Sequence, residues 1–341
     1  MTDGTVERQG LAARLGAFVH DLDFNNLPAE VVEAAKGRIL DTLSCCLAGR
    51  DLPPSRIAAD MSRSVAGECA VIGYERRTGM LEAALANGTM AHSTSQDDVI
   101  SGIAHGGSAV VPAALAVGEQ ERASGAEVIA AVVAGYEMVW RILKAVGRVA
   151  HPAFRPGTIF TALGAAAAAS RLMGLDAERT GHALGYAASL TPGTPNEGWW
   201  GGTMEPIIEI GMTARIGLLA AQFARAGGTA APLVFEGPHG FLNCWAGRND
   251  RVEQALDGLG RDFAVTRTYI KPFAACGANQ VPIQVARTLA SHGLGAEDIE
   301  RIVEKLRPGA KDYAGLDHAG PFTSHVQALM SMQFCAAAAV L

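Results

Sequence analysis

Residues 87–116, NGTMAHSTSQDDVISGIAHGGSAVVPAALA, place a dense group of polar side chains between two apolar, alanine-rich runs. The stretch holds two histidines, two aspartates, a glutamine and several serines and threonines. Such side chains cost free energy when they are buried without partners, and the glycines among them let the backbone approach a ligand closely. The stretch therefore predicts one wall of an active site.

The composition of the 341-residue chain excludes several classes of protein. A net charge of −6 without any basic run argues against nucleic acid as a partner. The sequence contains no stretch of eighteen apolar residues, so no membrane span is expected. The polar N-terminus does not resemble a signal peptide. The six cysteines form no CxxC pair, which predicts reduced thiols, no zinc knuckle and a cytoplasmic protein.

Helical periodicity continues on both sides of this stretch. Apolar residues recur at helical spacing most clearly over residues 125–146. The pattern predicts further helices over 8–22, 28–48, 55–65, 79–92, 109–122, 160–173, 176–190, 207–227 and 250–259, with a short β-like run at 69–74 and a loop at 191–206. Pro112 is expected in the first turn of its helix. We expect a mainly α protein whose large all-helical domain covers residues 1–262.

The pattern changes near residue 263. Residues 263–270 alternate and are β-branched, which predicts a strand. A helix is expected over 281–292, and residues 299–303 fit a second short strand. This order predicts a smaller α/β domain over residues 263–322 that looks incomplete. Residues 323–341 are expected to form a helix that returns to the helical domain.

The chain resembles the MmgE/PrpD family, which includes 2-methylcitrate dehydratase, cis-aconitate decarboxylase and iminodisuccinate epimerase. The matching motifs occur in family order along nearly the whole chain: Asn87-Gly88, Ala91-His92, Asp97-Asp98, His105, Val111-Pro112-Ala113-Ala114-Leu115-Ala116, Gly135-Tyr136-Glu137 with Arg141, Gly164-Ala165-Ala166, Gly174-Leu175-Asp176, Ala183-Leu184-Gly185, Gly211 with Ala214, Phe235-Glu236-Gly237, and Lys271-Pro272-Phe273 with Cys276. The resemblance implies a large helical domain, a smaller α/β domain and a homodimer without metal or organic cofactor. Members usually continue well beyond the point where this chain ends.

Departures from the family pattern concern the active-site motifs. Ser95 and Val99 stand where the HxLDFDDT segment has its first Asp and its Thr, and Gly106-Gly107 replaces Pro-Ser after His105. Arg155 aligns with the histidine of the HPT segment, and Glu209 with the histidine of TKxLHxG. Replacing cations by Glu should repel a polyanion. We therefore expect a substrate other than methylcitrate, and a less charged one.

Three residues are candidates for catalysis. His105 titrates near neutral pH and suits a general acid or base; a structural capping histidine is the alternative. Lys271 follows the predicted strand and suits an anion-binding or polarising group; an exposed lysine is the alternative. Tyr136 lies midway along the best helix and is either a proton donor or a core residue.

Other polar residues suit supporting roles. Asp97 and Asp98 are expected to hold the polar stretch, and Asp98 to orient His105. The set expected to bind substrate comprises Ser95, His92, Arg155 and Glu209; an arginine is a good carboxylate clamp. Vicinal Trp199-Trp200 suits a lid, a stacking wall or an interface plug.

The favoured function is a cofactor-independent lyase or isomerase. It would abstract a proton next to a carboxyl or carbonyl group of a small molecule, leading to dehydration, decarboxylation, epimerisation or cyclisation. A metal cluster of His92, Asp97, Asp98 and His105 fits no standard ligand spacing. An aspartate-rich magnesium motif of the terpene-cyclase kind lacks its second motif and an aromatic cavity. A homodimeric scaffold or partner subunit that has lost the chemistry is the remaining alternative.

Overall fold

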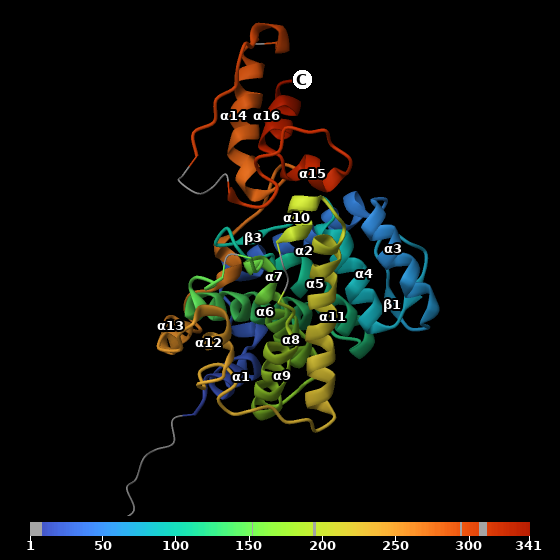
Figure 1. Cartoon of the computed structure of the whole chain (residues 1–341). Helices are drawn as coiled ribbons and strands as arrows, with labels where there is room; N and C mark the ends of the chain where they lie inside the picture. Colours follow the sequence, from blue (N-terminus) through green and yellow to red (C-terminus); the bar gives the residue numbers. More distant parts are fainter. Residues whose placement is uncertain (1–8, 152, 194–195, 294, 307–311) are drawn as a thin grey trace, which may run out of the picture.

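Helix α8 (Thr161–Leu172) lies at the centre of the helical body in the computed structural model (Figure 1). It packs against α5 (Gly106–Glu121), α6 (Gly125–Val146), α9 (Ala177–Leu190) and α11 (Glu205–Arg225). Its alanines 165–169 are completely buried. A Cβ at Gly164 would lie 2.5 Å from Val139 Cγ2 and 2.7 Å from the Gly135 carbonyl. Small side chains therefore let α6 and α8 approach closely.

The structure describes residues 9–151, 153–193, 196–293, 295–306 and 312–341. The remaining helices of the body are α1 (Leu11–Asp21), α2 (Ala29–Gly49), α3 (Pro53–Met61), α4 (Met80–His92), α7 (Pro156–Ile159), α10 (Glu197–Gly201), α12 (Phe241–Ala246) and α13 (Val252–Leu256). Most predicted helices are found within a few residues of their expected ends. The mainly α fold is confirmed, and the predicted loop at 191–206 differs in that it contains α10.

Pro112 lies inside α5 and not in its first turn, because the helix begins at Gly106. Proline cannot donate a hydrogen bond to the carbonyl four residues before it, here that of Ser108. A Cβ at Gly88 of α4 would lie 2.8 Å from this carbonyl oxygen. Glycine on α4 thus lets the two helices that flank the polar stretch come together.

The strands are only two residues long. β1 (Cys69–Ala70) pairs antiparallel with β2 (Arg77–Thr78), and β3 (Val99–Ile100) with β4 (Thr268–Tyr269). The strand predicted over 263–270 is wrong for its first half, which forms the 3₁₀ helix Ala264–Arg267. Since β3 belongs to the polar stretch, its pairing with β4 brings the segment that follows β4 to the predicted site.

Two buried side chains of α6 hold the segment that leads to β4. Arg141 Nη2 lies 2.5 Å from Glu137 Oε1 and donates to the Asp262 carbonyl at 3.0 Å. Glu137 Oε2 accepts from the Ala264 backbone N–H at 2.8 Å. Glu137 and Arg141 therefore pair with each other and hold the backbone at residues 262–264. This structural role explains the Glu and Arg of the Gly-Tyr-Glu…Arg motif.

A small domain lies above the body in Figure 1. It consists of α14 (Gln280–Ser291), α15 (His325–Met330), α16 (Met332–Val340) and connecting segments. Helix α15 contacts α10 of the body, while α16 packs against α14. The second strand predicted at 299–303 is wrong: residues 299–306 have no regular secondary structure. A strand needs a neighbour for its backbone groups, and no described residue of the small domain forms one.

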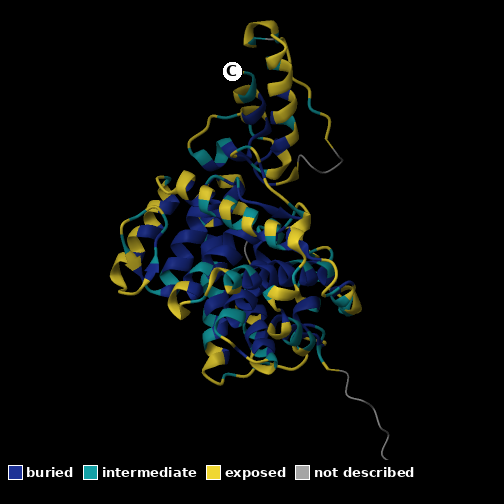
Figure 2. Ribbon diagram, turned by 180° about the vertical axis from the view of Figure 1, so that it is seen from behind, coloured by how far each residue is buried: buried dark blue, intermediate teal, exposed yellow. Residues whose placement is uncertain are grey.

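Burial differs between the two parts (Figure 2). Buried residues concentrate in the helical body, whereas much of the small domain is exposed. One described helix, α11, is long and apolar enough to cross a membrane by length and composition, and 61% of that window is buried inside the fold. A core helix passes the same test, so this feature is weak evidence for a span. All six cysteines are free.

Candidate active site

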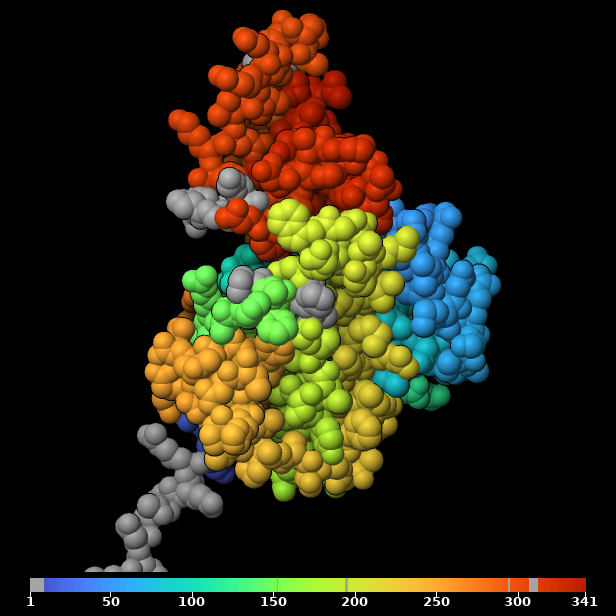
Figure 3. Space-filling view, in the orientation of Figure 1, coloured from blue at the N-terminus to red at the C-terminus, as the bar shows by residue number. Residues whose placement is uncertain are grey.

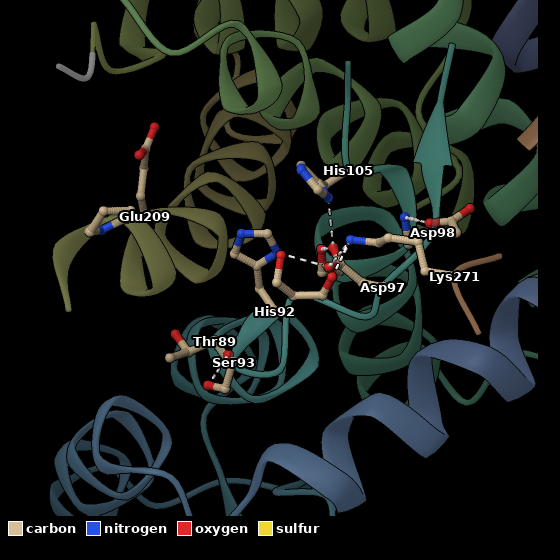
Figure 4. Close-up of polar contacts among 12 residues, drawn as sticks. Thr89, His92, Ser93, Asp97, Asp98, His105, Glu209 and Lys271 are labelled. Carbon is tan, nitrogen blue, oxygen red and sulfur yellow. Dashed lines mark hydrogen bonds and ion pairs between the residues drawn. The ribbon is translucent and has the colours of Figure 1, made fainter. Parts of the chain in front are cut away.

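Two histidines from the ends of neighbouring helices meet at one carboxylate (Figure 4). His92 is the last residue of α4, and His105 immediately precedes α5. Their rings lie 4.6 Å apart, edge to face. Asp97 Oδ1 lies 2.9 Å from His92 Nδ1, and Asp97 Oδ2 lies 3.1 Å from His105 Nδ1. The polar stretch therefore folds into a single cluster around Asp97.

Lys271 reaches the same carboxylate from the segment after β4. Its Nζ lies 3.7 Å from Asp97 Oδ1 and donates to the carbonyl of Ser95. Ser95 has a φ of 51°, a left-handed conformation that is uncommon for a residue with a Cβ. The Ser108 hydroxyl also donates to Asp97. Lys271 thus contacts the backbone carbonyl of Ser95 and not its side chain.

The ionisation of the cluster follows from burial and charge. Burial by itself would raise the pKa of Asp97, but His92, His105 and Lys271 together hold it well below its usual range. Burial is also the largest effect on the histidines: it lowers the pKa of His92 to about 3 and lowers that of His105. At neutral pH Asp97 is therefore ionised and both imidazoles are neutral.

Arg155 and Asp97 fix the same tautomer of His92 from opposite sides of its ring. Arg155 Nη2 donates to His92 Nε2 at 2.8 Å, so the proton of this imidazole is on Nδ1, facing Asp97. The guanidinium also donates to the Pro206 carbonyl at 2.6 Å and lies 4.7 Å from the ring centroid of Trp199. Arg155 is 2% exposed. The predicted carboxylate clamp is therefore engaged with protein groups.

Glu209 balances the charge of Arg155. Its Oε2 lies 3.3 Å from Arg155 Nη1, and its Oε1 accepts from the Thr158 hydroxyl. In Figure 4, Glu209 lies on the side of His92 that is remote from Asp97. The structure thus brings His92, Arg155 and Glu209 together. However, Arg155 and Glu209 pair with each other.

Asp98 points away from the histidines, so the prediction that it orients His105 is wrong: Asp97 faces that ring. Asp98 Oδ1 accepts from the Gly107 backbone N–H at 2.8 Å and Oδ2 from the Tyr136 hydroxyl at 2.9 Å. Arg38 Nε lies 3.7 Å from Oδ2. Burial raises the pKa of Asp98 to about 7 and that of Tyr136 well above its usual range.

The Gly106-Gly107 pair that replaces Pro-Ser is required by this second cluster. A Cβ at Gly106 would lie 2.9 Å from the Tyr136 ring. A Cβ at Gly107 would lie 2.6 Å from Asp98 Oδ1 and 2.7 Å from the Thr42 hydroxyl. Tyr136 and Asp98 therefore occupy the space that larger residues would need, and the hydroxyl of Tyr136 is directed to Asp98.

A metal ion fits the first cluster poorly. One ligand atom each from His92, Asp97 and His105 lie within 4.8 Å of one another, as a metal site requires. However, two basic side chains touch this set: Lys271 Nζ is 3.7 Å from Asp97, and Arg155 is 2.8 Å from His92. Their charges oppose a further cation. The arrangement is that of a hydrogen-bonded acid–base cluster.

Sequence reasoning did not single out three residues of the site. Ser108 lies within the polar stretch, one helical turn after His105, and its position was a usable signal. Thr158 and Arg38 lie far from that stretch in sequence, and only the packing of α7 and α2 brings them to Glu209 and Asp98.

Comparison with known proteins agrees with this architecture. A model of the MmgE/PrpD N-terminal domain matches residues 13–254. Cis-aconitate decarboxylase of Aspergillus terreus is 30% identical over 298 residues, which cover 83% of this chain and 60% of that protein. The cis-aconitate decarboxylase-like protein oryM of Aspergillus oryzae is 30% identical over 307 residues, 85% of this chain and 63% of that one. Human cis-aconitate decarboxylase is 28% identical over 243 residues, 69% and 50% respectively.

The helical body and the match over residues 13–254 define a protein of the MmgE/PrpD class. The chain belongs to the MmgE/PrpD family. It spans about 60% of the length of the first curated relatives that it matches.

Proposed function

We propose that the chain provides the acid–base site of an MmgE/PrpD-type lyase that acts on a carboxylic acid or carbonyl substrate. The observation that carries this proposal is the single buried carboxylate of Asp97, shared by two imidazoles and approached by one lysine. An isomerase would use the same first step, removal of a proton next to the carboxyl or carbonyl group.

His105 is the base in this proposal. Its side chain keeps 16% of its surface exposed, whereas those of His92, Asp97 and Lys271 have none. Because His105 Nδ1 lies 3.1 Å from Asp97 Oδ2, Nε2 is the nitrogen that we propose to receive the proton. The lowered pKa keeps the ring neutral and ready to accept that proton. Asp97 then stabilises the imidazolium, as a buried carboxylate does in hydrolase triads.

Lys271 supplies positive charge beside this pair. Held by the Ser95 carbonyl and close to Asp97, its ammonium group would stabilise the negative charge that develops when the proton leaves carbon. Tyr136 has no part in the step that we propose, because its hydroxyl donates to Asp98.

The substrate in this proposal carries less negative charge than citrate or cis-aconitate. The cluster pairs two basic side chains, Lys271 and Arg155, with two acidic ones, Asp97 and Glu209. Each basic group lies within 3.7 Å of one of the acidic groups. Among the described residues of the cluster both basic groups already have an acidic partner, so a second and third carboxylate of a substrate would face Glu209 unbalanced, which is costly in a dry site.

A panel assay tests the proposal. Purified protein is offered methylcitrate, citrate, cis-aconitate and a series of mono- and dicarboxylic acids, and NMR in deuterated water follows product formation and exchange at carbon. Decarboxylation is assayed first, because the named relatives are cis-aconitate decarboxylases; this reaction releases CO2 and adds a proton to carbon, so His105 would act in it as the proton donor. We expect turnover or exchange with a less charged acid, and its loss in His105→Ala and Lys271→Ala.

A half-buried histidine remote from the cluster, whose Nδ1 accepts from the Ala230 backbone N–H at 3.2 Å, gives the matched control. His182 lies on α9, 3.9 Å from an exposed glutamate, so His182→Ala should retain full activity. If folded His105→Ala and Lys271→Ala proteins keep full turnover, the proposed assignment is wrong.

A scaffold formed by two copies of the chain is the second candidate. A cavity of about 910 Å³ on the small domain is lined by exposed apolar side chains of α14 and residues 301–306, among them Val281, Val285 and Val303. Covering such a surface with a second copy would remove apolar area from water. A dimeric mass in solution without turnover of any acid in the panel would favour this alternative.

A further inference from the structure

The short helix α10 lies between the small domain and the acid–base cluster. Figure 3 shows the residues around 200 in contact with the C-terminal part of the chain. Ser324 donates to the Gly202 carbonyl at 2.6 Å, and Gln327 donates to the Gly201 carbonyl at 3.4 Å. Both donors belong to the small domain, which is therefore fastened to the end of α10.

Trp199 of α10 takes part in both regions at once. It is 3% exposed and belongs to an apolar cluster with Leu316, Val326 and other residues of the small domain. Gly315 has a φ of +80°, and a Cβ there would lie 2.7 Å from the Trp199 carbonyl. Only glycine suits both this positive φ and this short distance to Trp199. Gly315 therefore lets the small domain pack closely against α10.

Trp199 also lies against the site. The guanidinium carbon of Arg155 is 4.7 Å from the indole centroid, within cation–π range, and the His92 ring is 6.1 Å away, edge to face. Arg155 in turn donates to His92 Nε2, and His92 Nδ1 faces Asp97. A continuous path of contacts thus runs from the small domain to the carboxylate that His105 faces.

We infer that Trp199 is a positioning residue: its indole holds the Arg155 guanidinium where it donates to His92 Nε2 and so orients the His92 ring and, through it, Asp97. A rigid aromatic face suits this role, because a planar guanidinium stacks on it in one arrangement. The seating of the small domain on α10 then sets the geometry of the acid–base cluster.

The neighbouring tryptophan provides a matched control. Trp200 is on the same helix and is 50% exposed. Replacing Trp200 also removes one tryptophan from α10, but it leaves the contact between Trp199 and Arg155 in place.

The test compares Trp199→Leu, Trp199→Phe and Trp200→Leu. Leucine keeps an apolar side chain in the small-domain cluster but offers no aromatic face to Arg155, whereas phenylalanine keeps one. Imidazole ¹⁵N shifts of protein labelled at its nine histidines report the tautomers, and the His92 signals are assigned by their loss in His92→Gln. We expect Trp199→Leu to shift the His92 Nε2 signal toward that of an imidazole nitrogen that accepts no hydrogen bond, because the Arg155 contact at this atom is displaced, with Trp199→Phe and Trp200→Leu like wild type.

Kinetics form a second arm, which rests on the proposed function. With a substrate from the panel, Trp199→Leu should lower kcat by up to about a hundredfold, as misplacement of a catalytic group does, with KM changed much less. The NMR arm needs no substrate, so a failure of the proposed function leaves it intact. An unchanged His92 signature in Trp199→Leu, or the same change in Trp200→Leu, would overturn the inference.

Discussion

Asp97 and Asp98 are neighbours in sequence and both are buried, but their side chains contact different groups. Asp97 faces two imidazoles and an ammonium group, and its pKa is held well below the usual range. Asp98 faces a backbone N–H, a phenol and, at 3.7 Å, the Arg38 guanidinium, and its pKa is raised to about 7. Burial acts on both carboxyls; the two hydrogen bonds and one guanidinium oppose it at Asp98, whereas two imidazoles and Lys271 oppose it together at Asp97. Under the proposed mechanism, Asp97 takes part in the chemistry, whereas Asp98 holds the backbone and Tyr136 in place.

The largest effect is expected from Asp97→Asn. The amide keeps the size of the side chain but removes the negative charge that balances Lys271 and stabilises a protonated His105. Under the proposed mechanism, kcat/KM should fall between about a hundredfold and ten-thousandfold. The measurement is steady-state turnover together with thermal unfolding, since loss of one partner of a buried pair costs about 3–5 kcal/mol.

The same substitution at Asp98 serves as the comparison. If Asp98→Asn loses as much activity as Asp97→Asn while its circular dichroism stays native, the division between the two carboxylates is wrong.

The second prediction concerns the pH dependence of stability. A carboxyl whose pKa rises from about 4 in the unfolded chain to about 7 in the fold binds more protons when folded. The free energy of unfolding should therefore fall as the pH rises between these values. Asp98→Asn should remove this contribution to the pH dependence, which amounts to up to about 4 kcal/mol between the unfolded and the folded pKa. Urea titrations at pH 5, 6, 7 and 8 measure it.

Asp41 has to be tested beside it, because burial also raises its pKa to about 6. Asp41→Asn should flatten the slope mainly below pH 6, and Asp98→Asn up to pH 7. A slope unchanged by Asp98→Asn would mean that this carboxyl is ionised throughout.

The third prediction turns on the space around Asp98. Gly107→Ala places a methyl group 2.6 Å from Asp98 Oδ1 and 2.7 Å from the Thr42 hydroxyl. We expect a loss of about 1–3 kcal/mol, the usual cost of overpacking, in chemical unfolding. Gly37→Ala is the matched control: it lies in the helix α2 with open space around it, so alanine should stabilise by about 0.5–1 kcal/mol. Equal effects at both positions would refute the steric explanation.

The comparison also shows what sequence could and could not reveal. Helical periodicity predicted the body, and the polar stretch with Lys271 predicted which residues meet. Periodicity could not tell Asp97 from Asp98, because which of two adjacent carboxyls faces His105 depends on the backbone between α4 and β3. The strand predicted over 263–270 became largely a 3₁₀ helix, because only a two-residue partner, β3, lies beside it.

The pairing of Arg155 with Glu209 was likewise beyond sequence reasoning. Both residues stand where the family motifs have histidines, so each was interpreted as a separate group that faces the substrate. Fifty-four residues separate them in the chain, and only the packing of α7 against α11 makes them partners.

The smallest effect is expected at Ser95, where two readings of one residue differ. The sequence predicted that its side chain binds substrate, whereas the structure places its carbonyl on Lys271 and its φ at 51°. Ser95→Gly keeps the carbonyl and relieves a left-handed conformation that costs roughly 1–2 kcal/mol, partly offset by the greater freedom of glycine in the unfolded chain. We therefore expect a gain of no more than about 1 kcal/mol and unchanged turnover. Ser95→Ala removes the hydroxyl but keeps the strain, so a rise in KM shared by both variants would show that the hydroxyl binds substrate after all.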